Sequence, residues 1–430
     1  MANKIRSIFS DNLFRSSGRL FGAFMVASVF NYLFQIVMGR LLGPGQYGLL
    51  NALLSLLVVL SIPISTLLMA VSAKAAEYRA RSDGGGISGL YSQVTRRVLK
   101  AGGAGLIVFL LCSSLIGSYL RAPSLVPVLL LGTAAFFSLL GPVNTAMLQG
   151  LQDYKWLGIT MALSGPARLV FSVLPVLAGF GINGAVGGLV ATGIFAWWIT
   201  YAPLKKHITT PGDEERGGHL AFSRVMPIFA ANLAFAVMTQ ADIVLVNRYF
   251  LPHEAGVYAS AAILGRAVMY IPGSIVLAMF PMVSETKALN TSGRHLLFKS
   301  LLATSFFSGG GALLFYLFPE WIIGTFFGAG YLEAASLLKY FGLAMLPMAF
   351  LLVFMNYFVA REKNVFSYIM AVCAVLEIAA MHLYHSTPLD IVKALSAAGV
   401  LALLTGIAAQ WAPLVPARGK GEARFNEEPI

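Results

Sequence analysis

Five ionisable residues lie inside long apolar stretches of this sequence: Arg168, Arg266, Lys339, Asp242 and Glu377. An ionised side chain at the centre of a membrane span costs about 2.5–3.5 kcal/mol on insertion scales. Groups retained at such a cost typically bind a charged ligand, relay a coupling ion or pair with one another. The three bases therefore predict a site for an anion, and the two acids predict an ion pair or a coupling site.

The five charges are expected at similar depth. Counted along the helices that would carry them, they fall roughly 9–18 Å below one membrane surface. Asp242 and Arg266 lie on consecutive helices, which allows an ion pair that is either structural or broken during transport. Arg168 has no acid at equal depth in its own half, and we expect it to face a hydrated cavity. Glu377 has three interpretations: a protonated buried acid, a partner of a base, or a coupling site.

Six amide side chains accompany these charges within the apolar stretches: Asn31, Gln35, Asn144, Asn232, Gln240 and Asn356. Asn31 and Gln35 are four residues apart, so they share a helix face and favour a common wet surface. Asn144 and Asn356 occupy nearly equivalent positions in the two halves of the chain, although such residues also join helices to one another. The predicted cavity residues are Arg168, Arg266, Lys339, Asn31, Gln35, Asn144 and Asn356, with Asp242 and Glu377 as coupling or ion-pair residues.

The elements that carry these residues are membrane spans. Apolar residues make up 58% of the chain, charged residues only 11%, and the mean hydropathy is +0.77. Soluble domains carry about 25% charged residues, and a bilayer core is crossed by about 20 apolar residues. We therefore predict an all-α integral membrane protein of about twelve transmembrane helices. They are expected near 18–41, 48–73, 101–120, 126–149, 156–180, 184–203, 225–250, 257–281, 298–318, 333–358, 365–384 and 391–414.

One passage of the sequence occurs twice. GRLLGPGQYG at 39–48 and NRYFLPHEAG at 247–256 align at a constant offset of 208, with Arg40, Pro44 and Gly48 matching Arg248, Pro252 and Gly256. The pair Ile62-Pro63 matches Ile271-Pro272 at an offset of 209. Internal repeats of membrane spans are typical of transporters whose substrate site lies between the repeats.

The repeat and the loops predict the domain organisation. Segment 204–224 has linker composition and divides the chain into six-helix bundles at 1–203 and 225–414, with a tail at 415–430. Because six spans is an even number, both halves insert the same way up, related by a pseudo-two-fold axis along the membrane normal. Placing 23 of the 30 basic residues on one side makes that side cytoplasmic, together with both termini.

Other classes of function find little support. No GxxxxGK[ST] motif is present, so ATP hydrolysis is not expected. Cys112 and Cys373 have no ligand spacing, and neither a metal nor another cofactor is expected. The net charge of +12 is spread over short loops beside the spans, so nucleic acid is not an expected partner.

Three passages resemble a known family. They are GRLLGPGQYGLLNALLSLL after the first span, MLQGLQDYKWLG at 147–158, and ADIVLVNRYFLPHEAGVYASAAILGR at 241–266. They are similar to the bacterial polysaccharide-biosynthesis or oligosaccharide flippases of the multidrug/oligosaccharidyl-lipid/polysaccharide flippase superfamily. The likeness covers most of the chain.

The resemblance implies two six-helix bundles in the bacterial cytoplasmic membrane. It implies a non-enzymatic transporter that turns an undecaprenyl-pyrophosphate-linked saccharide to the outer leaflet by alternating access. Cavity arginines of such flippases are thought to meet the pyrophosphate or acidic sugars, and Asp242 matches the family's acid in span 7. H⁺ or Na⁺ as coupling ion, and a glycan polymerase or export machinery as partner, are further implications.

Two other functions stay open. A multidrug or toxin exporter of the same superfamily would favour acids over bases in its cavity, because its substrates are usually cationic. A membrane-embedded glycan enzyme would need a sizeable outer loop or paired surface acids, whereas the outer acids here are scattered singly.

Overall fold

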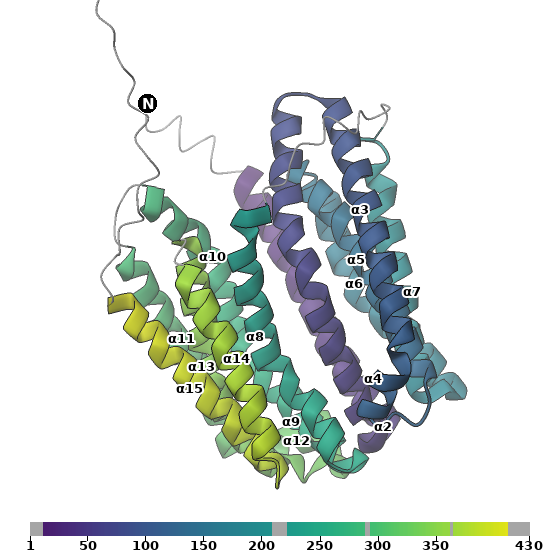
Figure 1. The fold of residues 1–430 in the computed structure, drawn as a ribbon, viewed down its shortest axis with the longest axis vertical. Helices are drawn as coiled ribbons and strands as arrows, with labels where there is room; N and C mark the ends of the chain where they lie inside the picture. The colour runs from purple at the N-terminus through teal and green to yellow at the C-terminus, as the bar shows by residue number, and fades with distance from the viewer. Residues whose placement is uncertain (1–11, 209–221, 289–292, 362–363, 412–430) are drawn as a thin grey trace, which may run out of the picture.

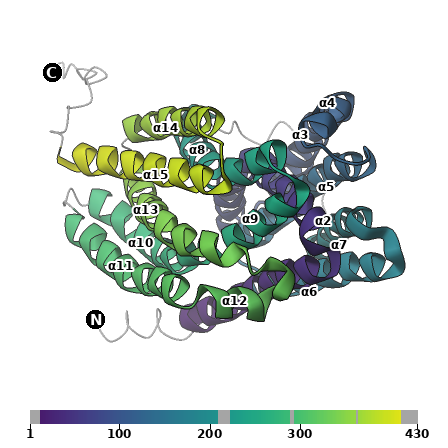
Figure 2. The same cartoon turned by 90° about the horizontal axis from the view of Figure 1, so that it is seen from below.

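The computed structural model describes residues 12–208, 222–288, 293–361 and 364–411, and the secondary structure in these ranges is helical throughout. The linker prediction falls largely on 209–221 and the tail prediction on 415–430, outside the described residues. The helices form two groups that lie side by side, coloured purple through blue to blue-green and teal to yellow (Figures 1 and 2). α2 packs against α8 and α9 where the groups meet.

The first group contains the predicted spans 1 to 6. Its helices are α2 (Asn12–Ala80), α3 (Gly84–Leu111), α4 (Ser113–Tyr119), α5 (Val126–Gly150), α6 (Tyr154–Pro175) and α7 (Gly181–Leu204), with a π-helical turn η1 (Val176–Phe180) before α7.

α2 carries two spans that reverse direction at Gly43. This glycine has φ 69° and ψ 171°, a backbone conformation that side chains with a Cβ rarely adopt. The Tyr47 hydroxyl donates a hydrogen bond of 3.1 Å to Oε1 of Gln35, twelve residues earlier. In an unbroken helix these residues would be about 18 Å apart along the axis. Figure 1 shows the two arms of α2 running side by side.

A second reversal separates α6 from α7. Gly179 and Gly181 both have positive φ, at 92° and 52°. A residue of α2 holds this turn in place, because the Ile182 amide donates a hydrogen bond of 3.0 Å to the side-chain oxygen of Gln46. The predicted third span is also bent, with α3 and α4 meeting at 57°.

The second group contains the predicted spans 7 to 12. Its helices are α8 (Phe222–Tyr249), α9 (Pro252–Gly265), α10 (Tyr270–Ala288), α11 (Arg294–Leu317), α12 (Pro319–Phe326), α13 (Ala334–Ala360), α14 (Asn364–Leu383) and α15 (Pro388–Trp411). Short 3-10 turns η3 (Arg266–Met269) and η4 (Ala329–Tyr331) lie between α9 and α10 and between α12 and α13.

These helices confirm the predicted fold class. In the described ranges, nine stretches are long and apolar enough to cross a membrane, and the bent pair α3–α4 makes a tenth. Two of the nine, Gly22–Ile64 with 43 residues and Tyr154–Leu204 with 51, contain the reversals described above and therefore supply two spans each. Within the described residues, every predicted span thus lies on one helix or on consecutive helices of the structure.

The repeated passages pack directly against each other. A Cβ at Gly256 would overlap the carbonyl group of Pro44, and a Cβ at Gly48 would lie 2.7 Å from the Gly256 nitrogen. Only glycine allows this approach, because any side chain would push the two backbones apart. We call this end of the molecule, where the turns at Pro44 and Pro252 meet, the paired-turn end.

Two arginines make equivalent contacts at the paired-turn end. Arg40 donates to the carbonyls of Thr325 and Phe326, at 2.5 and 2.9 Å, where α12 ends. Arg248 lies near the carbonyls of Ser118 and Tyr119, at 3.4 and 3.5 Å, where α4 ends. The offset of 208 that relates the arginines also relates Ser118 to Phe326. Each arginine therefore caps the C-terminal carbonyls of a short helix in the opposite group.

We expect removal of both caps to weaken the contact between the groups. Arg40→Ala and Arg248→Ala should each cost about 1 kcal/mol, because each leaves helix-terminal carbonyls without a cationic partner. Thermal unfolding of the purified protein should show a lower Tm for the double variant than for either single variant. Lys393→Ala is the control, since it removes an exposed i,i+3 ion pair with Asp390 that is worth under about 1 kcal/mol. An unchanged Tm in the double variant would contradict this role.

Candidate functional site

A polar cavity of about 320 Å³ lies between the two helix groups. Both arms of α2 and α6 line it from the first group, and α8, α9, η3 and α10 line it from the second. We call it the central cavity. Its polar lining consists of Asn31, Tyr32, Gln35, Asn51, Ser55, Arg168, Gln240, Arg266 and Tyr270.

The structure brings four of the seven predicted cavity residues together here, namely Arg168, Arg266, Asn31 and Gln35. Asn31 and Gln35 face the same space, as their spacing of four residues predicts.

Arg168 projects from α6 toward the first arm of α2. Its Nη1 donates to Oδ1 of Asn31, at 3.0 Å, and its guanidinium carbon lies 4.2 Å from the centre of the Phe34 ring. The helices approach closely one turn away, where a Cβ at Gly165 would lie 2.7 Å from that of Phe30. Among the described residues, no acid forms a salt bridge with Arg168. The cation is therefore held by an amide and an aromatic face, which leave its charge uncompensated.

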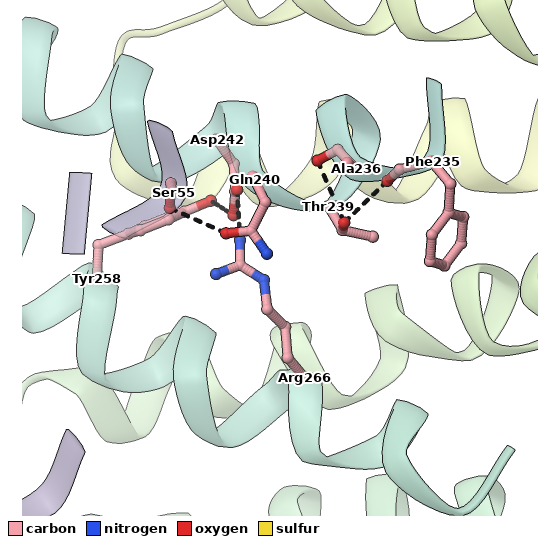
Figure 3. Close-up of polar contacts among 8 residues, drawn as sticks. All are labelled: Ser55, Phe235, Ala236, Thr239, Gln240, Asp242, Tyr258 and Arg266. Atoms are coloured by element: carbon pink, nitrogen blue, oxygen red, sulfur yellow. Dashed lines mark hydrogen bonds and ion pairs between the residues drawn. The ribbon is translucent and has the colours of Figure 1, made fainter. Parts of the chain in front are cut away.

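Arg266 approaches the cavity from the second group and is paired. Its Nη2 donates to Oδ1 of the fully buried Asp242, at 2.5 Å (Figure 3). The Tyr258 hydroxyl donates to the other oxygen of this carboxylate, at 3.1 Å. Nε and Nη1 of Arg266 have no hydrogen-bond partner among the described residues. The ion pair that the sequence left open is therefore present, and the guanidinium retains two unused donors.

Glu377 adds a second buried acid. It lies on α14, which packs against α8, and is only 1% exposed. Neither carboxylate oxygen has a hydrogen-bond partner in the described part of the chain, although Asp242 and Arg266 lie within electrostatic range. The buried cluster therefore contains one base, Arg266, and two acids, Asp242 and Glu377. Burial of an unpaired carboxylate is costly, so the group is neutral overall only when one proton or another monovalent cation is added.

Three predicted cavity residues do not line the central cavity. Asn144 joins α5 to α7 by donating to the Trp197 carbonyl and the Thr200 hydroxyl, at 3.2 and 3.1 Å. Asn356 donates to the Leu352 carbonyl of its own helix, at 2.9 Å. Lys339 lies half-buried on α13. The helix faces that carry these three side chains therefore point away from the central cavity.

The sequence missed several of the polar residues that line the cavity. Tyr32 and Tyr270 come from opposite groups, and their ring centres are 5.1 Å apart. Ser55 donates to Oε1 of Gln240, at 2.9 Å, so a second pair joins the groups (Figure 3). Asn51 and Ser55 are four residues apart on α2, which is the same spacing signal that identified Asn31 and Gln35.

The central cavity is suited to an anion. Arg168 and Arg266 line it, and neither acid of the buried cluster does. Guanidinium groups bind phosphate or carboxylate through paired N–H donors, and such hydrogen bonds strengthen away from bulk water.

One family model matches the chain over residues 37–336, and that family is described as polysaccharide biosynthesis protein. Among curated proteins, no sequence matches this chain.

Solved structures of transporters are similar over nearly the whole length. An inward-facing multidrug resistance MATE family transporter of the MOP superfamily has a TM-score of 0.74 at 14% identity, covering 89% of this chain and 94% of its own. The lipid II flippase MurJ in an inward closed conformation has a TM-score of 0.67 at 15% identity, covering 90% and 87%. A MOP superfamily transporter from Pyrococcus furiosus has a TM-score of 0.65 at 14% identity, covering 92% and 95%. At these identities the likeness shows a shared fold.

Proposed function

The chain belongs to the polysaccharide biosynthesis protein family, and on that basis we propose that it is a flippase for a lipid-linked saccharide. The substrate is a saccharide joined by pyrophosphate to a long isoprenoid lipid of the undecaprenyl type. Its head group passes through the central cavity by alternating access, and its tail stays in the lipid beside the protein. No covalent step is needed, so the protein acts as a transporter and not as an enzyme.

The uncompensated charge of Arg168 is the observation that carries this proposal. The side chain lines a cavity between the helix groups, and it contacts an amide and an aromatic ring. A cation kept in a membrane span without an acid favours an anionic ligand. The pyrophosphate or an acidic sugar would supply that anion, with the two unused donors of Arg266 on the opposite wall.

A multidrug exporter is the second candidate, because transporters of that kind share this fold. Buried acids are the feature that would favour a cationic substrate, and Asp242 and Glu377 are such acids. Asp242 forms an ion pair with Arg266, however, and Glu377 does not line the central cavity. The basic lining therefore supports the saccharide carrier over the cation exporter.

We assign Asp242 and Glu377 to coupling within the same mechanism. The cluster of two acids and one base takes up one cation when it becomes neutral, and H⁺ or Na⁺ would serve. Loss of that cation would strengthen the pull of both acids on Arg266 and weaken its hold on an anion. Binding of the coupling ion and release of the substrate head would thereby be linked.

Reconstituted protein tests the proposed function. In liposomes that contain an undecaprenyl-pyrophosphate-linked oligosaccharide, the protein should expose the saccharide to an impermeant glycosidase added outside. Liposomes that contain the same lipid-linked oligosaccharide but no protein give the spontaneous rate of exposure. If the protein does not accelerate exposure of the saccharide but does export a cationic dye, the multidrug exporter replaces this proposal.

The proposed setting is the cytoplasmic membrane of a bacterium, with both termini and the linker between the bundles 1–203 and 225–414 in the cytoplasm. The paired-turn end then faces outward. A glycan polymerase or export machinery would receive the product there.

Cysteine labelling tests this orientation. In a variant that lacks Cys112 and Cys373, a cysteine at the exposed Ser386 should react with an impermeant maleimide in intact cells. A cysteine at the exposed Ser82 should react only after the membrane is opened, because basic residues flank it. Labelling of Ser82 in intact cells would reverse the assignment.

A further inference from the structure

A second cavity of about 530 Å³ lies within the first helix group, between the second arm of α2, α3 and α5. Its lining is apolar apart from one residue, Arg97, at one end. Its residues on α3 recur every three or four positions from Val94 to Phe109, so one face of that helix forms its wall. We call it the α3 pocket.

Small residues keep the α3 pocket open. Gly102, Gly105 and Ala101 line it from α3, and Gly132 and Ala135 line it from α5. At Gly102 and Gly132 the helices touch, since a Cβ there would lie 3.0 Å from Leu139 and 2.5 Å from Phe109. Gly105 differs, because a Cβ at this position would meet no atom within 4 Å. The helices are thus in contact on both sides of Gly105, and the space beside it is unfilled.

The length of the α3 pocket matches one leaflet of a bilayer. Arg97 and Phe109 are twelve residues apart on α3, which is about 18 Å along the helix axis. The hydrocarbon core of a bilayer is about 30 Å thick, so one leaflet spans roughly 15 Å. A single hydrocarbon chain that starts at the level of Arg97 would reach the far end of the pocket near the middle of the membrane.

The charges at the Arg97 end of the α3 pocket are basic. Arg97 lines the pocket, and the exposed Arg96 and Lys100 flank it on the same helix. Basic residues between helices at the membrane surface attract the phosphate of anionic lipids. We propose that the α3 pocket binds one anionic phospholipid, with an acyl chain along Gly105 and the phosphate at Arg97.

This lipid site borders the central cavity through α2. Leu57 and Val58 line the central cavity, whereas Leu60, Pro63 and Ile64 line the α3 pocket. The helix therefore separates the two spaces, and Pro63 lies at the pocket, where a proline weakens the helix locally. A lipid chain packed against Pro63 supports α2 on the side away from the substrate head.

Lipid retention by the purified full-length protein tests the proposal without measuring transport. The protein is exchanged from detergent into nanodiscs of phosphatidylcholine that contain a minor fraction of phosphatidylglycerol, re-extracted, and analysed for bound lipid. The wild type should keep phosphatidylglycerol in about one-to-one ratio and in excess over its share of the nanodisc. Arg97→Gln should weaken this enrichment about fivefold, the value of one basic residue near a membrane surface.

Gly105→Leu is the decisive variant, and Gly103→Leu is its matched control. Both glycines lie on α3 and have no atom within 4 Å of an added Cβ, but only Gly105 lines the pocket. Leucine favours the helix over glycine by nearly 1 kcal/mol, so both variants should fold. Gly105→Leu should lose the bound lipid, and Gly103→Leu should keep it. Equal retention in both variants, indifference to head-group charge, or enrichment of an added polyprenyl phosphate instead would overturn the assignment.

Discussion

Arg168→Ala is expected to abolish most substrate flipping while the protein still folds. The change removes a hydrogen bond to Asn31 and a contact with the Phe34 ring, but it leaves no acid without a partner. The stability cost should therefore be about 1 kcal/mol. Loss of charge-assisted hydrogen bonds to a phosphate is worth about 1.5–3 kcal/mol, which lowers transport roughly ten- to hundredfold. Flipping in liposomes, scaled to the amount of folded protein, measures the effect.

Two further variants show whether the charge of Arg168 and its place in the cavity both matter. Arg168→Lys keeps a cation and should retain part of the activity, although it loses the paired donors. Lys339→Ala removes a base that was predicted at a similar depth but does not line the central cavity, so this variant should transport normally. Full transport by a stably folded Arg168→Ala would remove the main support for an anionic substrate.

Arg266→Ala is expected to have the largest effect on stability. Asp242 is fully buried, and the change leaves its carboxylate with only the Tyr258 hydroxyl as a side-chain partner. Breaking a buried ion pair by removing one partner costs about 3–5 kcal/mol. The amount of folded protein in the membrane and its Tm in detergent should both fall sharply. An Arg266→Ala protein as stable as the wild type would show that the pair contributes little.

The double variant Asp242→Asn with Arg266→Gln separates structure from transport. It removes both charges and keeps polar side chains of similar size, so folding should largely return. If transport also returns, Arg266 serves mainly to neutralise Asp242. If the protein folds and does not transport, the charge of Arg266 or of Asp242 is needed for substrate binding or coupling.

Glu377→Gln is the companion to that test, since it removes the acid whose oxygens have no partner among the described residues. It should fold at least as well as the wild type, because a buried carboxylate becomes neutral. If Glu377 takes part in coupling, transport by the Glu377→Gln variant should no longer respond to a proton or sodium gradient.

The sequence determined the elements and predicted a similar depth for the charges. Long apolar stretches predicted the spans, and the turn at Gly43 and Pro44 was identified by its repeat at Pro252. These features depend on local chain properties: hydrophobic length, glycine conformation and a fixed rise of about 1.5 Å per residue. The matching depth of Asp242 and Arg266 followed from the same count, and they do form a pair.

Only the tertiary structure decided which side chains meet. Successive side chains on a helix point about 100° apart around its axis. The depth of a residue therefore does not say which way its side chain points until packing fixes the rotation of the helix. Arg168 reaches Asn31 because α6 packs closely on α2 at Gly165, whereas Lys339 at similar predicted depth does not reach the cavity. Glu377 joins the buried cluster because α14 packs on α8, a contact between segments more than a hundred residues apart. Such contacts depend on how whole helices fit together, and no local pattern in the sequence encodes that fit.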